Sequence, residues 1–324
     1  MASSPLTSSV HRRRRRRRRR VALGAGLGVL VVLAAGTVLL AGGGDDKPGA
    51  SGKREARAAP PPPPELPRGG RTLLPRHRIV AFYGAPQDDE LGELGIGSPA
   101  SAARRLVRQS RRYWRKTRPV LPAMELIAVV ASYAPGPGNR YSTRQEDKVV
   151  RRYLRAARRA KALLVLDIQP GRSDFFTETL RLRKWLKEPD VGLALDPEWR
   201  MAPGQVPGKV IGSVGSREVN ATSAWLEQLA ERHNLPQKLF LIHQFTNDMV
   251  DDTKLKDRPR LAMVLNADGF GGQAIKKAKY HAFTRSPRKF FHEGFKLFYR
   301  EDTDLMKPRQ VLRLHPPPDV VIYE

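Results

Sequence analysis

The chain has 324 residues, 59 Lys and Arg against 32 Asp and Glu, a formal net charge of +27, and no cysteine. The missing cysteine excludes disulfides, cysteine-based zinc sites, thiol nucleophiles and lipidation at a lipobox. A hydrophobic content of 40% is enough for a large core, and no strict repeat runs through the chain, so collagen-like, coiled-coil and fully disordered classes are excluded. A charge this high is typical of proteins that bind nucleic acids or membrane surfaces, so its distribution along the chain decides its meaning.

The first 41 residues predict a basic cytoplasmic tail (1–20) and a transmembrane signal anchor (21–41). Nine consecutive arginines, Arg12 to Arg20, precede an apolar run, Val21 to Ala41, that contains no charge. A helix over this run would be about 31 Å long, enough to cross a hydrocarbon core of roughly 30 Å. The run is longer than the apolar region of a cleavable signal peptide, so we expect an uncleaved, single-pass anchor in the cell membrane. Because positive charge stays in the cytoplasm, everything after the anchor is predicted to be extracytoplasmic.

Residues 42–75 are rich in glycine, charges and proline, including Pro60 to Pro64, and predict a disordered linker before a globular domain at 76–324. Residues 1–59 hold 13 Lys and Arg against 3 acids, a net charge of +10, which leaves +17 for residues 60–324. The globular part is therefore basic in its own right.

Eight short apolar runs follow the linker, and amphipathic helical stretches separate most of them. The runs are Ile79–Tyr83, Leu126–Tyr133, Ala162–Gln169, Val191–Glu198, Leu239–Gln244, Leu261–Asn266, Phe295–Tyr299 and Val320–Tyr323. Nearly continuous hydrophobicity is typical of parallel strands that are covered on both faces. Eight strands in about 250 residues predict an α/β fold, an imperfect (β/α)₈ TIM-like barrel. A doubly wound open sheet is the alternative.

The expected helices begin at recognisable signals. Ser98-Pro99 opens the first, to about Lys116, and the capping box Thr143-x-x-Glu146 opens the second, to about Lys161. Three more are expected at 174–187, 216–233 and 272–283. The connections after the fifth and seventh strands are short or irregular, which makes the barrel imperfect.

The first helix carries a basic stripe of Arg104, Arg108, Arg111 and Arg115. One interpretation is a solvated outer face. The other is attraction to anionic lipid head groups or anionic wall polymers. Nucleic acid is not an expected partner, because the domain is predicted to be outside the cell and has no reader motif.

Polar residues collect where the predicted strands end, which is where barrel enzymes place their chemistry. The candidate catalytic residues are Glu198, Asp196, Asp167, His243 and Asp268. The candidate substrate-binding residues are Tyr83, Tyr133, Gln169, Trp199 and Gln244. On a continuing strand, Asp196 and Glu198 would face the same side, and repulsion between two close carboxylates would raise one pKa toward that of a general acid.

This D-x-E strand resembles the catalytic strand of glycoside hydrolases of the chitinase and lysozyme-like barrels. The resemblance implies that Glu198 is the acid, that Asp196 orients the substrate acetamide or its equivalent, and that Trp199 stacks on a sugar. It covers this strand alone, because Val191 and Ala194 stand where the full D-x-x-D-x-D-x-E pattern has acids. The competing interpretation is a strand-exit turn whose acids cap a loop or pair with arginine.

A wider set of segments, IVAFYG, LDIQPGRSDF, ALDPEW, HQF, ADGFG and GFKLFY, resembles a family of exported, often lipoprotein-type proteins of high-GC Gram-positive bacteria. That resemblance implies a location in the bacterial envelope and a barrel-like fold, with no established activity.

Two functions follow from the sequence. The first is a membrane-anchored hydrolase of cell-envelope glycans that needs no cofactor, with a divalent-metal hydrolase built on Asp167, His243 and Asp268 as a variant of it. The second is a non-catalytic envelope protein that binds an anionic lipid or wall polymer through its basic helices or its barrel mouth.

Overall fold

The computed structural model describes residues 62–285 and 290–324, and the chain from Pro63 onward forms one compact unit. The predicted tail, the predicted anchor and the linker up to residue 61 lie outside the described residues. Within the described part, no helix is both long and apolar enough to cross a membrane.

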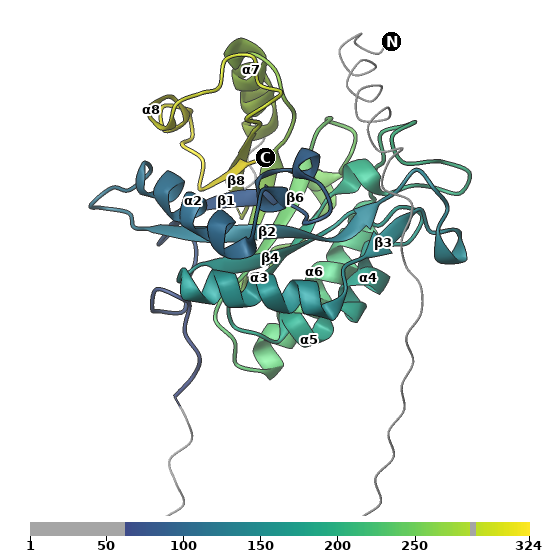
Figure 1. Ribbon diagram of the computed structural model, residues 1–324, viewed down its shortest axis with the longest axis horizontal. Helices are drawn as coiled ribbons and strands as arrows, with labels where there is room; N and C mark the ends of the chain where they lie inside the picture. Colours follow the sequence, from purple (N-terminus) through teal and green to yellow (C-terminus); the bar gives the residue numbers. More distant parts are fainter. Residues whose placement is uncertain (1–61, 286–289) are drawn as a thin grey trace, which may run out of the picture. The chain divides into compact units, whose positions relative to one another are not determined.

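Eight parallel strands close into a barrel (Figure 1). They are β1 (Arg78–Gly84), β2 (Val120–Ala131), β4 (Leu163–Ile168), β5 (Val191–Leu195), β6 (Lys238–Gln244), β7 (Leu261–Ala267), β8 (His292–Leu297) and β9 (Val320–Tyr323). Neighbouring strands pair in this order, and pairing of β9 with β1 closes the ring. All eight predicted strands are present, so the barrel is confirmed over the open sheet. One further strand, β3 (Ser142–Arg144), pairs antiparallel with the end of β2.

Two strand boundaries differ from the prediction in ways that matter for the site. Strand β2 begins at Val120, six residues earlier than expected, and therefore includes Glu125. Strand β5 ends at Leu195, and Pro197–Trp199 form a 3-10 turn. Pro197 has no amide hydrogen with which to continue the ladder, so the strand stops before Glu198.

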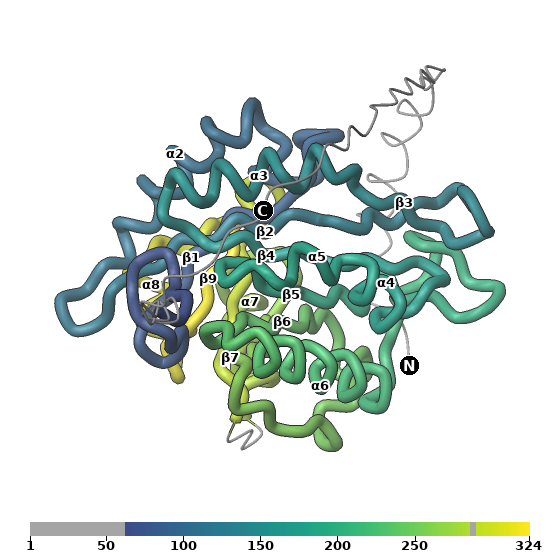
Figure 2. Tube along the Cα trace, turned by 90° about the horizontal axis from the view of Figure 1, so that it is seen from below, coloured from purple at the N-terminus to yellow at the C-terminus, as the bar shows by residue number. Residues whose placement is uncertain are grey.

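Seven helices connect the strands: α2 (Pro99–Arg111), α3 (Asp147–Arg159), α4 (Phe175–Arg181), α5 (Arg183–Leu186), α6 (Ser216–Arg232), α7 (Gln273–Thr284) and α8 (Pro308–Val311). Short 3-10 turns lie at η2 (Asp89–Leu91), η3 (Glu93–Gly95), η4 (Pro137–Asn139), η5 (Pro197–Trp199) and η6 (Asp252–Lys254). Helix α2 packs beside α3, and α4 packs beside α6, on the outside of the barrel (Figure 2). The β6–β7 connection holds only η6 and the β8–β9 connection only the four-residue α8, as the irregular spacing predicted.

The second helix does not begin at the predicted capping box. Thr143 lies in β3, where it pairs with Val130, and α3 begins at Asp147 with Glu146 at its N-cap. The ladder to β2 keeps this part of the chain extended and moves the start of the helix. The expected helix at 174–187 is also interrupted, because Leu182 separates α4 from α5.

Two apolar cores lie on opposite faces of the strands. One fills the space between the strands and the outer helices and includes Leu164, Leu193 and Phe240. The other fills the barrel interior and includes Val165, Ala194 and Leu241, the residues next in sequence to those three. Alternation along the strands therefore assigns inner and outer positions, except in β2, where a register shift between Ile127 and Val129 places both Ala128 and Val129 in the outer core.

The segment before β1 closes the amino end of the barrel. Leu66, Leu73 and Leu74 are buried in the inner core, although the prediction placed them in the linker. The side-chain oxygen Oε1 of Gln237 accepts hydrogen bonds from the amides of Leu73 and Leu74, at 2.8 and 3.2 Å. We call residues 63–75 the plug, since they belong to the folded unit and cover its floor.

Candidate active site at the carboxyl end of the barrel

Each of the eight barrel strands supplies an ionisable side chain to the inner positions near its carboxyl end. In chain order these residues are Tyr83, Glu125, Asp167, Asp196, His243, Asp268, Lys296 and Glu324. Their side chains point into the barrel, like those of the apolar residues that precede them on each strand. In β4, for example, Asp167 follows Leu163 and Val165 at spacings of two residues. We call this set the polar layer. It replaces the apolar layer that would otherwise fill the top of a small barrel.

One half of the polar layer is organised around the hydroxyl of Tyr83. Its Oη lies 3.0 Å from Oδ2 of Asp167 and 3.5 Å from Oδ2 of Asp196. Nε2 of Gln169 donates to the same Oη at 2.9 Å and lies 3.4 Å from Oδ2 of Asp196. Two carboxyl groups from neighbouring strands therefore meet at one hydroxyl, and both are buried.

The other half is organised around His243. Its Nδ1 lies 2.9 Å from Oδ2 of Asp268, and its Nε2 lies 3.0 Å from Oε1 of Glu125. Nζ of Lys296 lies 3.2 Å from Oδ2 of Asp268 and 2.8 Å from Oε2 of Glu324. The same ammonium lies 3.8 Å from the centroid of the Tyr83 ring, which links the two halves.

Five carboxyl groups face two cationic side chains in this layer, and the imbalance raises the proton affinity of two of the acids. Burial, followed by the charge of Asp196, raises the pKa of Asp167 well above its usual value. Burial also raises the pKa of Asp196 to about 7, with a further upward contribution from Glu198 and an opposing one from His243. Asp196 therefore exchanges its proton near neutral pH, as a general acid must.

The remaining charges are held by direct pairing. Burial acts to raise the pKa of Asp268, but Lys296 and the hydrogen bond from His243 keep it well below its usual value. For His243, burial and Lys296 act to lower the pKa, yet hydrogen bonds to Asp268 and Glu125 raise it well above its usual value. The imidazolium can then donate from both ring nitrogens.

The structure brings several predicted site residues together and separates others. Asp167, Asp196, His243, Asp268, Tyr83 and Gln169 share the barrel interior. Glu198 lies in the 3-10 turn and is half-buried, so it does not continue the strand as predicted, although its charge reaches Asp196. The predicted geometry of the D-x-E pair is therefore wrong, while the electrostatic coupling between its two acids is present.

Three predicted binding residues are not part of the polar layer. Gln244 follows His243 in β6 and so points to the opposite, helix-facing side of the strand. The Trp199 side chain is only 3% exposed, which leaves no open ring face for stacking on a sugar. Tyr133 follows the end of β2 and is 43% exposed.

Glu125, Lys296 and Glu324 of the polar layer, and Asn266 beside His243, were not among the predicted site residues. Glu125 is a fully buried carboxylate inside an otherwise apolar strand, and that contrast was the available signal. Asn266 depends on Gly294 of the next strand, because a Cβ at Gly294 would lie 2.7 Å from Oδ1 of Asn266. A glycine in a buried strand marks such a close approach.

Three residues of the polar layer could together hold a divalent metal ion. Ligand atoms of Glu125, Asp167 and His243 lie within 4.8 Å of one another. Oε2 of Glu125 and Oδ1 of Asp167 are buried without a hydrogen-bond partner, and one nitrogen with two carboxylate oxygens suits Zn²⁺ or Mn²⁺. Asp268 would then orient His243, a role different from the ligand role predicted for it.

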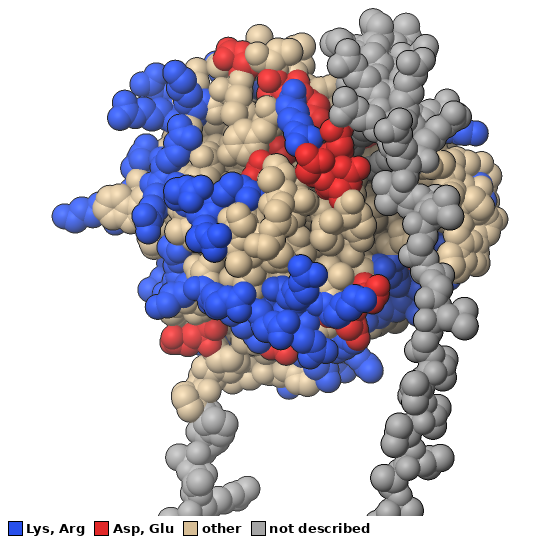
Figure 3. Space-filling view, viewed as in Figure 1, with Lys and Arg blue, Asp and Glu red and all other residues tan. Residues whose placement is uncertain are grey.

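The basic stripe predicted on the first helix lies on the outside of the barrel, away from the polar layer. Arg104, Arg108 and Arg111 belong to α2, whereas Arg115 follows the end of that helix. Lys and Arg side chains gather over α2 and α3 on this face of the molecule (Figure 3).

No protein-family model matches the chain, and no curated protein sequence matches it. Among solved structures, the chain is similar to a GH5 xyloglucan-specific endo-β-1,4-glucanase from a metagenomic library, in complex with cellotriose. The identity is 11% and the TM-score 0.39, over 79% of this chain and 86% of that chain. Similarity at this level carries no conclusion about activity, so the chemistry must be argued from the residues of this chain.

Proposed function

We propose that this protein is a hydrolase that cleaves glycosidic bonds of cell-envelope glycans with carboxyl groups at the carboxyl end of its barrel. The observation that carries the proposal is the convergence of Asp167 and Asp196 on the hydroxyl of Tyr83, beside the half-buried Glu198. Glycoside hydrolysis needs a protonated and an ionised carboxyl group in one site. The pKa of about 7 for Asp196 supports this arrangement.

The roles differ from those that the resemblance implied. Asp196 has the proton affinity of a general acid and would protonate the leaving oxygen as the glycosidic C–O bond breaks. Glu198 would then act as the carboxylate that takes a proton from the attacking water, whose hydroxyl adds to the sugar. Tyr83, Gln169 and Asp167 position Asp196 through the hydrogen bonds already described.

The experiment measures release of soluble sugar fragments from purified wall glycans by the full-length protein. Asp196→Asn and Glu198→Gln should each lower the rate by about 10²- to 10⁴-fold, the usual size of an acid–base contribution. Asp304→Asn, at an exposed carboxylate, is the matched control and should retain the parent rate. No release by the parent, or full activity of Asp196→Asn, would refute the proposal.

A second candidate, a divalent-metal hydrolase, is favoured by the proximity of Glu125, Asp167 and His243 and by the two unpartnered carboxylate oxygens. Calorimetric titration of the full-length protein with Zn²⁺ and Mn²⁺ tests binding, with Glu125→Gln as the variant that should lose it. If chelation by EDTA abolishes fragment release and Zn²⁺ or Mn²⁺ restores it, the metal mechanism replaces the carboxylate mechanism. If chelation leaves release unchanged, the metal mechanism fails.

We also propose that the barrel is held outside the cell by the anchor predicted at residues 21–41. The nine arginines that precede an uncharged run support this orientation. Fusions of alkaline phosphatase and of a fluorescent protein to the end of the chain test it, since the phosphatase is active only when exported. An active fluorescent fusion with an inactive phosphatase fusion would place the barrel in the cytoplasm and overturn the orientation.

A further inference from the structure

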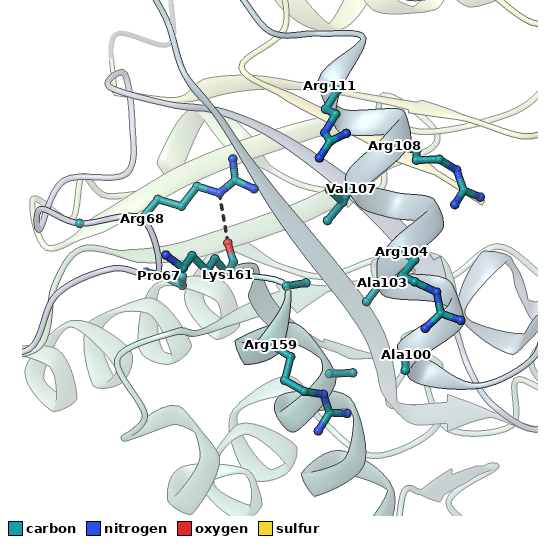
Figure 4. Close-up of a pocket in the computed structure, with 13 residues that line it drawn as sticks. Pro67, Arg68, Ala100, Ala103, Arg104, Val107, Arg108, Arg111, Arg159 and Lys161 are labelled. Atoms are coloured by element: carbon teal, nitrogen blue, oxygen red, sulfur yellow. Dashed lines mark hydrogen bonds between the residues drawn. The ribbon is translucent and has the colours of Figure 1, made fainter.

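A groove on the outer wall of the barrel lies between α2, the end of α3 and the plug segment around Arg68. It encloses about 1050 Å³, and Figure 4 shows its lining side chains. The lining residues are Pro67, Arg68, Gly69, Ala100, Ala103, Arg104, Val107, Arg108, Arg111, Ala156, Arg159, Ala160 and Lys161. We call this the basic groove. It is separate from the polar layer, which lies inside the barrel.

The groove has charge of one sign only. Six of its lining residues are Lys or Arg, none is acidic, and all six cations are exposed. Within residues 62–285 and 290–324, none of the six forms an ion pair with an acidic side chain. Burial, followed by the charge of Arg111, lowers the pKa of Arg68.

Two basic residues close to the groove are paired with acids. Arg158, next to Arg159, pairs with Asp190 and Glu188 at 2.8 and 2.5 Å. Arg144 makes a two-pronged pair with the buried Glu178. Acids on this side of the barrel therefore neutralise Arg158 and Arg144, whereas the groove cations, like the exposed Arg152 and Arg155 of α3, have no acidic partner among the described residues.

The chemistry of the lining indicates what would neutralise it. Cations from α2 line the groove together with Arg159, Lys161 and Arg68, beside a floor of alanine and valine side chains. Guanidinium groups bind phosphate oxygens in pairs, and methylene groups can pack on the small apolar floor. The lining contains no aromatic residue, so it offers no platform for stacking nucleic-acid bases. A recessed floor also does not fit the plane of a bilayer.

We propose that the basic groove binds a linear polyol-phosphate polymer, with phosphates on the two rows of cations and the aliphatic backbone along the floor. This site is independent of the proposed hydrolase activity. Three residues of the predicted stripe, Arg104, Arg108 and Arg111, belong to it, whereas Arg115 does not.

The test uses the full-length protein and poly(glycerol phosphate). Because Arg12–Arg20 also attract polyanions, the readout must be local: slowed amide hydrogen exchange in α2 and α3 when the polymer is added. The variant R104A/R108A/R159A removes three groove cations, and the control R115A/R152A/R155A removes three exposed arginines that do not line the groove. Unchanged exchange without polymer verifies that both variants are folded.

We expect slowed exchange in the parent and in the control, and at least a tenfold higher polymer concentration for the same effect in the groove variant. The dependence of apparent affinity on salt should weaken by about two counterions in the groove variant, roughly 0.7 for each lost phosphate contact. Equal losses of polymer affinity in both variants would mean that net charge alone explains the binding, and would overturn the proposal. Slowed exchange with single-stranded DNA or anionic vesicles, and none with poly(glycerol phosphate), would assign the groove to another ligand.

Discussion

The polar layer and the basic groove are both rich in charged residues, but the charges are arranged in opposite ways. In the polar layer, acids and cations from eight strands are buried and joined through hydrogen bonds, for example between His243 and both Asp268 and Glu125. In the basic groove, six cations face solvent with no acid among them. The difference shows that burial, more than composition, decides what a charged side chain does. A buried charge is paired within the fold, whereas an exposed charge without an acidic partner is available to a ligand.

The largest effect should come from removing the cation at the centre of the polar layer. Lys296→Met leaves the carboxylates of Asp268 and Glu324 without their ammonium partner, so we expect a loss of about 3–5 kcal/mol in the free energy of unfolding. Urea denaturation measures it, with Lys161→Met in the groove as the control. Equal free energies of unfolding for the two variants would mean that the buried lysine contributes no more to stability than the exposed one.

The next effect concerns pH. The pKa of Asp196 is about 7 in the folded protein against 3.8 when exposed, so the folded state binds this proton more tightly. Its contribution to stability is fully present below about pH 4 and is lost as pH rises to 7, by at most about 4 kcal/mol. Asp196→Asn should remove this part of the slope between pH 4 and 7 in denaturation curves. An unchanged slope would contradict the shifted pKa.

A smaller effect is expected for an arginine on the outer wall that does have a buried partner. Arg144→Ala leaves Glu178 buried with only the Ser173 hydroxyl as a side-chain hydrogen-bond donor, which should cost about 2–3 kcal/mol. Binding of poly(glycerol phosphate) should stay at the parent level, because Arg144 lies outside the groove. Weakened binding together with unchanged stability would place Arg144 with the ligand-binding cations instead.

The smallest change in stability is expected in the groove itself. Arg108→Ala removes an exposed cation with like-charged neighbours, so the free energy of unfolding should change by no more than about 0.5 kcal/mol. Any change should be a gain at low salt that disappears at high salt, because screening removes the repulsion. A loss above about 1 kcal/mol by thermal denaturation would show that Arg108 supports the fold.

The sequence predicted the barrel because its strands are local features, continuous apolar runs such as the one around Leu193 that pattern alone identifies. The polar layer was predicted only in part. Asp167, Asp196, His243 and Asp268 follow or end such runs, whereas Glu125 lay just before the predicted strand that begins at Leu126, and Lys296 lay within the predicted strand Phe295–Tyr299. The partner of Glu125 is His243, 118 residues away in sequence on β6, so only the folded ring reveals that pair. Asp268, the partner of Lys296, follows the neighbouring strand β7.

The missed features elsewhere have similar causes. Thr143 and Glu146 have the spacing of a capping box, but pairing of β3 with β2 competes for the same residues. The plug has the composition of a linker, and its leucines are buried only because the barrel floor lies over them.

The plug also sets how the folded unit would respond to mechanical load. Tension applied through the residues before Pro63 would reach the plug before it reached β1. The first bonds to the barrel to bear it would be those of Arg68 to the carbonyl oxygens of Val120 and Lys161, at 2.8 and 3.2 Å. Those of Arg71 to the carbonyl oxygens of Asn234 and Leu235, and those of Gln237 to Leu73 and Leu74, would follow. These bonds would break one after another, so the floor would open while the closed ring of strands remained intact. Under load, the plug would therefore detach from the barrel before the candidate active site is disrupted.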